Sequence, residues 1–184
     1  MQRKLDSAWA ARAPNLPYRN PYEALIMASI VEKETGRANE RPLIAAVFIN
    51  RLRIGMRLQT DPTVIYGLGD AFDGNLRKRD LLKDTPYNTY TRAGLTPTPI
   101  ALPGLAALRA AVHPSKTDAL YFVARGDGHH FFATTFEQHL ANITAALPAP
   151  KGIKLTPQTI PAYFTVSALT EPKLPPGLPE WLTK

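Results

Sequence analysis

The sequence predicts an α+β fold: a single domain with a central buried helix, several further helices, a small antiparallel hairpin and a proline-rich C-terminal tail. Helical spacing of apolar residues recurs through most of the chain before residue 147. Two short apolar stretches, 119–124 and 129–133, flank the turn sequence Arg-Gly-Asp-Gly and predict the hairpin. Eight prolines follow Leu147, where helical periodicity is weak. We therefore expect one domain over residues 1–147 and an appended tail over 148–184.

The central helix is predicted from the stretch that leads up to Gly36. Asn20 can cap this helix, Pro21 suits its first position, and Gly36 is a natural stop. Eight residues without a charge, from Ala24 to Val31, precede two closely spaced glutamates. An apolar helix that ends in a carboxylate can hold that group in a partly dry place, where burial raises its pKa and suits it to act as a general acid.

The two glutamates, Glu32 and Glu34, are separated by about 200° around a helix with 3.6 residues per turn. Because they face nearly opposite ways, we expect only one of them to face a cleft. The pattern alone does not choose between them. The alternative is that both are solvated residues at the end of a core helix, which is the usual environment of glutamate.

Further elements follow from periodicity and from the placement of proline and glycine. A proline-rich segment, 94–104, predicts a stiff, extended loop that can form the wall of a groove, because proline fixes φ and removes a donor. A strand over 119–124 pairs with one over 129–133. The other predicted helices cover residues 3–13, 40–53, part of the charged segment 70–85, 105–112, and a stretch from Thr134 or Thr135 to Ile143.

Two segments mix polar and aromatic side chains in a way that suits sugar recognition, which combines hydroxyl hydrogen bonds with a flat apolar ring. The first is 56–69, and its alternative interpretation is a helix start with Thr60 or Asp61 as N-cap and Pro62 at the first position. The second is 87–90, where alternation predicts extended structure with one aromatic face buried.

Composition narrows the function classes. The chain of 184 residues carries a formal net charge of +7, and such a surface can attract nucleic acid, anionic lipid or an acidic polymer. No segment shows a DNA-binding layout. There is no cysteine, which excludes disulfides and thiol chemistry. No signal peptide is visible, and no apolar run approaches the roughly 20 residues of a membrane span.

Histidines 129, 130 and 139 raise the question of a metal site. No HExxH motif supports one, and His129 and His130 are expected to point to opposite faces of a strand. We therefore expect no metal and no cofactor.

Several long motifs follow one another in unbroken order over about residues 18–145. They are Ala28-Ser-Ile-Val-Glu-Lys-Glu-Thr35, Val47-Phe-Ile-Asn-Arg-Leu-Arg53, Met56-Arg-Leu-Gln-Thr-Asp-Pro-Thr-Val-Ile-Tyr-Gly67, Tyr87-Asn-Thr-Tyr90 and Leu120-Tyr-Phe-Val123. Together these motifs resemble those of the MltG/YceG-like endolytic murein transglycosylases. The resemblance implies a bacterial lyase that cuts peptidoglycan glycan strands between N-acetylmuramic acid and N-acetylglucosamine without water and leaves a 1,6-anhydro-muramic end.

The resemblance places the catalytic glutamate of the family at Glu32. Ordinary glycosidases use two carboxylates; here the muramic 6-hydroxyl is the nucleophile, so one carboxyl group can suffice. His130 matches the histidine of the family's Gly-Gly-His segment, although His129 replaces its second glycine. Our candidates for the sugar-binding cleft are Gln59, Thr60, Asp61, Tyr66, Tyr87, Asn88, Tyr90 and His130.

Family members usually begin with a transmembrane helix and a small LysM-like domain, neither of which is recognisable here. By analogy the protein is expected at the outer (periplasmic) face of the bacterial inner membrane, where family members are thought to terminate nascent strands near peptidoglycan synthases. An inactive peptidoglycan-binding module is the alternative, and a binder of nucleic acid or anionic surfaces is a third hypothesis that the charge alone supports.

Overall fold

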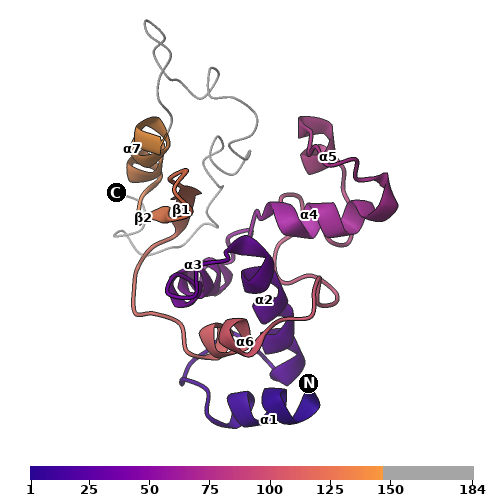
Figure 1. The fold of residues 1–184 in the computed structure, drawn as a ribbon, viewed down its shortest axis with the longest axis vertical. Coiled ribbons are helices and arrows are strands. Elements are labelled where there is room, and N and C mark those ends of the chain that lie inside the picture. The colour runs from indigo at the N-terminus through magenta and orange to yellow at the C-terminus, as the bar shows by residue number, and fades with distance from the viewer. Residues whose placement is uncertain (147–184) are drawn as a thin grey trace, which may run out of the picture.

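The computed structural model describes residues 1–146, and these form a helical body with a small hairpin at one end (Figure 1). This arrangement confirms the α+β expectation; the predicted tail over 148–184 lies outside the described residues. The elements are α1 (Gln2–Ala10), α2 (Pro21–Glu34), α3 (Arg41–Arg53), α4 (Asp61–Leu68), the short 3₁₀ helix η1 (Gly69–Ala71), α5 (Lys78–Leu82), α6 (Leu105–Val112), β1 (Tyr121–Ala124), β2 (His130–Ala133) and α7 (Phe136–Ala146).

Helix α2 is the centre of the fold, as the sequence predicts. The side chain of Asn20 caps it by accepting a hydrogen bond from the backbone N–H of Glu23 at 3.0 Å. Every residue from Ile26 to Val31 is buried. Helices α3 and α6 pack against α2, and α1 lies below α6 in Figure 1. A helix that is apolar all round is stable only with such neighbours.

Helix α3 joins the helical body to the hairpin. The side-chain amide of Asn50 donates to the carbonyls of Thr117 and Ala119 at 2.8 and 3.1 Å. The rings of Phe48 and Phe122 meet edge to face, with centroids 5.7 Å apart. Strands β1 and β2 pair antiparallel, and α7 packs against both of them.

The proline-rich segment 94–104 contains no regular helix or strand, as expected. Its backbone is tied to α2 at two places. The N–H of Ile100 donates to Ser29 Oγ at 2.9 Å, and the N–H of Gly104 donates to Glu32 Oε2 at 2.8 Å. The loop therefore forms a wall beside the C-terminal end of α2.

The expectation of extended structure at 87–90 is wrong. These residues form consecutive turns, and the segment is built around the buried side chain of Asn88. The Asn88 carbonyl oxygen accepts from the backbone N–H groups of Thr91 and Arg92 at 3.2 and 3.0 Å. Alternation of polar and aromatic residues resembled a strand pattern, but local side-chain hydrogen bonds to the backbone compete with strand pairing.

Within residues 1–146, no helix combines the length and the apolar character that crossing a membrane requires.

Candidate active site

Glu32 lies in the last turn of α2, and its side chain retains 28% of its exposure. Its Oε2 accepts the hydrogen bond from the Gly104 N–H at 2.8 Å, and its Oε1 lies 3.7 Å from Nη2 of Arg41. The carboxyl group is thus held from two sides, by the proline-rich loop and by the first residue of α3. It remains accessible to a ligand, which a reacting acid or base must be.

Neither the contact with Gly104 nor the contact with Arg41 was predicted from the sequence. Gly104 has no side chain, and a Cβ added there would lie 3.3 Å from Glu32 Oε2, which is a tight contact. Arg41 has a mostly buried side chain whose Nε has no hydrogen-bond partner within residues 1–146. Gly104 lies far along the chain from Glu32, and Arg41 lies on another helix, so no local sequence pattern connects either residue to Glu32.

Glu34 points into a different environment from Glu32. Its Oε2 accepts a hydrogen bond from Thr60 Oγ1 at 3.1 Å. Burial and the neighbouring Asp61 carboxylate raise the pKa of Glu34 to about 7, although the Thr60 hydroxyl and Arg51 oppose the increase. The carboxyl group with a raised pKa that the sequence leads us to expect at this helix end is therefore found at Glu34.

Asp61 and Tyr90 complete this second cluster. The Tyr90 hydroxyl donates to Asp61 Oδ1. Burial raises the pKa of Asp61, and the hydrogen bond from Tyr90 opposes that effect. Three of the predicted sugar-binding residues thus belong to one cluster with Glu34: Thr60 bonds to Glu34, and Tyr90 bonds to Asp61, whose charge acts on Glu34. Thr60 and Tyr90 are buried.

A buried arginine underlies the cluster. Arg51 donates from Nε to the carbonyl of Leu120 at 2.6 Å and from Nη1 to that of Leu58 at 2.7 Å. Burial lowers its pKa to about 10, so the guanidinium stays charged at neutral pH. Gln59, which follows Leu58, adopts a left-handed backbone with φ of 50°, and its side-chain oxygen is buried without a partner in the described part of the chain.

Tyr66 and Tyr87 form the most accessible aromatic pair among the candidates. Their ring centroids lie 4.9 Å apart at an interplanar angle of 60°. Tyr66 is 45% exposed, and the Tyr87 hydroxyl is hydrogen-bonded to Thr98 Oγ1 at 2.8 Å. An exposed ring held by a second ring can serve as a platform for the apolar face of a sugar.

Asn88 has a different environment. It is fully buried, its side-chain amide donates to the carbonyls of Leu81 and Lys83 at 3.0 and 2.7 Å, and its side-chain oxygen accepts from the N–H of Tyr90. All of its polar atoms are engaged within the protein, so in this structure its role is to shape the turn that carries Tyr87 and Tyr90.

His130 contacts Glu40 instead of the other sugar-binding candidates. Its Nδ1 lies 2.7 Å from Glu40 Oε2, while Nδ1 of His129 lies 3.0 Å from Oε1 of the same carboxylate. The prediction that the two histidines point to opposite faces is wrong, because His129 precedes β2 and strand alternation does not apply to it. Nowhere in residues 1–146 do three or more His, Asp or Glu side chains form a group that could hold a metal ion.

The contacts of Glu40 with His129 and His130 matter for the site because Glu40 immediately precedes Arg41. Burial alone would raise the pKa of Glu40, but the hydrogen bonds from His130 and His129 outweigh it and lower the pKa below its usual value. Arg37 adds bonds from the same loop to the carbonyls of Asp127 and Gly128. The hairpin turn thereby fixes the loop that links α2 to Arg41.

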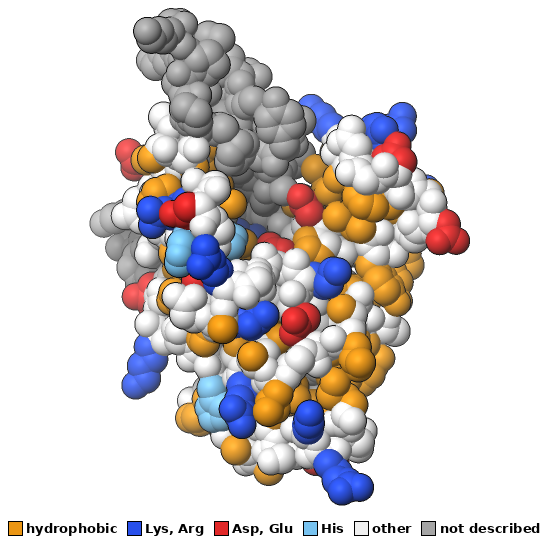
Figure 2. Space-filling model, in the orientation of Figure 1, with side chains coloured by type: hydrophobic (Ala, Val, Ile, Leu, Met, Phe, Trp, Pro, Cys, Tyr) orange, Lys and Arg blue, Asp and Glu red, His pale blue; other side chains and the backbone are white. Residues whose placement is uncertain are grey.

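On the face shown in Figure 2, acidic side chains near the middle of the surface have basic neighbours. Fold and site together define a helical domain in which the Glu32 carboxyl group lies accessible at the end of the central helix. Such a layout is suited to acid–base chemistry on a bound ligand.

The chain belongs to the YceG-like family, which matches residues 1–145. It is 49% identical over 118 residues to an endolytic murein transglycosylase of Bacillus subtilis (strain 168), covering 64% of this chain and 32% of that protein. It is 38% identical over 126 residues to an endolytic murein transglycosylase of Streptococcus pneumoniae serotype 2 (strain D39), covering 66% and 23%.

A solved structure supports the same fold. The 2.6 Å crystal structure of a YceG-like protein from Listeria monocytogenes is similar with a TM-score of 0.61 and 40% sequence identity, covering 75% of this chain and 41% of that one. The chain therefore spans less than half the length of each of these relatives.

Proposed function

We propose that this domain is the catalytic part of a peptidoglycan lytic transglycosylase, which cleaves the bond between N-acetylmuramic acid and N-acetylglucosamine and leaves a 1,6-anhydro-muramic end. The observation that carries the proposal is the accessible carboxyl group of Glu32, held between Gly104 and Arg41. Membership of the YceG-like family and two relatives named endolytic murein transglycosylase support the substrate class.

In this mechanism Glu32 acts twice. As an acid it donates its proton to the glycosidic oxygen as the bond from that oxygen to the anomeric carbon of muramic acid breaks. As a carboxylate it then takes the proton of the muramic 6-hydroxyl, whose oxygen bonds to the same anomeric carbon. Glu32 ends with the proton that it had at the start, and no water is consumed. Proton transfer by a positioned side chain contributes roughly 10²- to 10⁴-fold to rate.

The main-chain N–H of Gly104 and the guanidinium of Arg41 keep the carboxyl group oriented while its charge changes. We assign the edge-to-face pair Tyr66 and Tyr87 to the sugar-binding cleft as an aromatic platform. Asp61 and Gln59 belong to the same proposed cleft, in which the buried Tyr90 bonds to Asp61 and the buried Thr60 bonds to Glu34.

The proposed setting is the outer face of the bacterial inner membrane. There the enzyme would act on nascent strands as a terminator of elongation, beside the synthases that make them. This part of the proposal rests on the family resemblance.

The test is a digest of purified glycan strands by the wild-type protein and by Glu32→Gln, with products read by mass spectrometry. Anhydro-muramic ends from the wild type, reduced at least 10²-fold in the variant, are expected. Glu34→Gln removes the other carboxyl group at the same helix end, so comparing it with Glu32→Gln shows which of the two glutamates cleavage requires. Glu137→Gln, an exposed residue of α7, controls for the loss of one charge.

Other outcomes would redirect the assignment. Reducing ends would indicate hydrolysis with a second carboxylate, for which Asp61 is the first candidate. If the wild type and all variants bind the strands but none cleaves them, a peptidoglycan-binding module would be favoured.

A further inference from the structure

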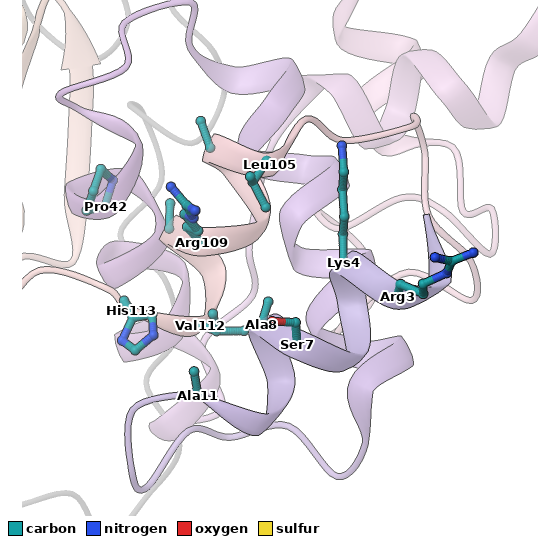
Figure 3. Close-up of a pocket in the computed structure, with 12 residues that line it drawn as sticks. Arg3, Lys4, Ser7, Ala8, Ala11, Pro42, Leu105, Arg109, Val112 and His113 are labelled. Atoms are coloured by element: carbon teal, nitrogen blue, oxygen red, sulfur yellow. The ribbon is translucent and has the colours of Figure 1, made fainter.

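A groove between α1 and α6 is lined by basic side chains and by no acidic one (Figure 3). Its volume is about 740 Å³, within the range of ligand sites. Arg3 and Lys4 of α1, Arg109 of α6, and His113 just beyond α6 contribute its polar groups. The floor consists of small apolar residues, including Ala8 and Val112 of the two helices.

The cations of this groove are available to a ligand. Arg3, Lys4 and Arg109 are exposed, and within residues 1–146 none of their side chains makes a hydrogen bond or ion pair with the protein. Figure 3 shows the Lys4 and Arg109 side chains on either side of Leu105, whereas Arg3 extends away from them. On the face in Figure 2, basic side chains gather over the region of α1 and α6. Such an unpaired set attracts anions.

Two residues that line the groove are sequence neighbours of residues that contact Glu32. Leu105 lines the groove and directly follows Gly104, whose N–H binds Glu32 Oε2 at 2.8 Å. Pro42 lines its other side and follows Arg41, whose Nη2 lies 3.7 Å from Glu32 Oε1. A polymer bound at Glu32 therefore has the groove beside it.

We propose that this groove binds carboxylates of the peptides attached to the glycan strand, with Lys4 and Arg109 as the principal contacts. The proposal rests on the function proposed above, because that function supplies a polymer with acidic side branches. Charge complementarity argues for an anionic branch, and the shallow floor of Ala8, Ala11 and Val112 suits short aliphatic groups between the charges.

The test measures binding separately from cleavage. Every protein carries Glu32→Gln, so that the strands stay intact. The ligands are short fluorescent strands with free peptide carboxylates, and the same strands with those carboxyl groups converted to methylamides. The double variant Lys4→Gln, Arg109→Gln is compared with a charge-matched control, Lys78→Gln, Lys83→Gln, whose side chains are exposed on and just after α5.

The groove variant is expected to bind the free-carboxylate strands roughly three- to tenfold more weakly at low salt, as the loss of two exposed ion pairs implies. Binding of the methylamide strands is expected to stay the same, the control variant to match its parent, and the difference to shrink as salt rises. Since both altered side chains are exposed, unchanged thermal melting should show that the variants fold.

Equal affinity of the parent for the two kinds of strand would overturn the inference and leave any cleavage result of the wild type intact. A second result would also overturn the inference: inorganic pyrophosphate displaces the strands, while methylamidation has no effect on binding. The groove would then be a phosphate site. Failure to bind either strand would reject the inference together with peptidoglycan as the ligand.

Discussion

Replacing Glu34 by Gln should change how the stability of the domain depends on pH. Burial and Asp61 raise the pKa of Glu34 to about 7 in the folded protein, whereas an unfolded glutamate titrates near 4.3. Below about pH 4 both states are protonated, and the site contributes its full stability. Between these values the unfolded chain loses the proton that the native state keeps, so stability falls as pH rises.

The size of the effect follows from the shift. Each pKa unit corresponds to about 1.4 kcal/mol, so the shift to about 7 costs at most about 4 kcal/mol above neutral pH. Glu34 as a residue retains partial exposure, and solvent screening reduces this cost, so we expect about 1 to 3 kcal/mol. Glutamine has nearly the same shape, can accept the Thr60 hydrogen bond, and carries no charge at any pH.

The assay is urea unfolding of the wild type and Glu34→Gln at several pH values from 4 to 8.5. The variant should gain stability relative to the wild type as pH rises, with most of the change between about pH 5 and pH 7.5. Glu137→Gln, at an exposed carboxyl group, should follow the wild type throughout. Parallel curves for the wild type and Glu34→Gln, or a variant that is less stable at pH 8, would refute the argument.

Two more stability predictions follow from buried polar groups. Asn88→Ala should cost roughly 2 to 4 kcal/mol in urea unfolding, because it removes the hydrogen bonds of the buried Asn88 side chain to the Leu81 and Lys83 carbonyls and from the Tyr90 N–H; a loss under 1 kcal/mol would contradict this. Glu40→Gln should cost about 1 to 3 kcal/mol at pH 7 by weakening its bonds to His130, and the deficit should shrink as pH falls below about 4.3, where an unfolded glutamate titrates, toward the lowered pKa of the folded carboxyl group; a deficit that persists in acid would point to packing instead.

The parts of the fold that depend on local signals could be predicted from the sequence. The helix at 105–112 has the bounds that were expected, since His113-Pro114 cannot continue it. The cap at Asn20 and the hairpin around 125–128 follow the same logic. These signals lie within a few residues of the feature they determine, so one sequence suffices to read them.

Long-range contacts could not be predicted in this way. Glu32 meets Gly104, 72 residues later in the chain, and Glu40 meets His130, 90 residues later. Neither pairing leaves a periodic trace. The turn at 87–90 was mistaken for extended structure because the side chain of Asn88 organises it through partners on both sides, and alternation carries no information about those partners.

The helical pattern alone leaves Glu32 and Glu34 as alternatives, and the family resemblance places the catalytic glutamate at Glu32. The structure gives the two residues distinct surroundings. About 200° of helix rotation directs one carboxyl group to the surface beside Gly104 and Arg41, and the other into the cluster of Thr60 and Asp61. The raised pKa of Glu34 and the contacts of Glu32 with Gly104 and Arg41 are separate properties of the two carboxyl groups, so cleavage by the variants has to choose between them. If Glu32 is the acid, Glu34→Gln should keep cleavage while changing stability, and Glu32→Gln should do the reverse. That double dissociation is a sharper test of the assignment than the loss of activity in either variant alone.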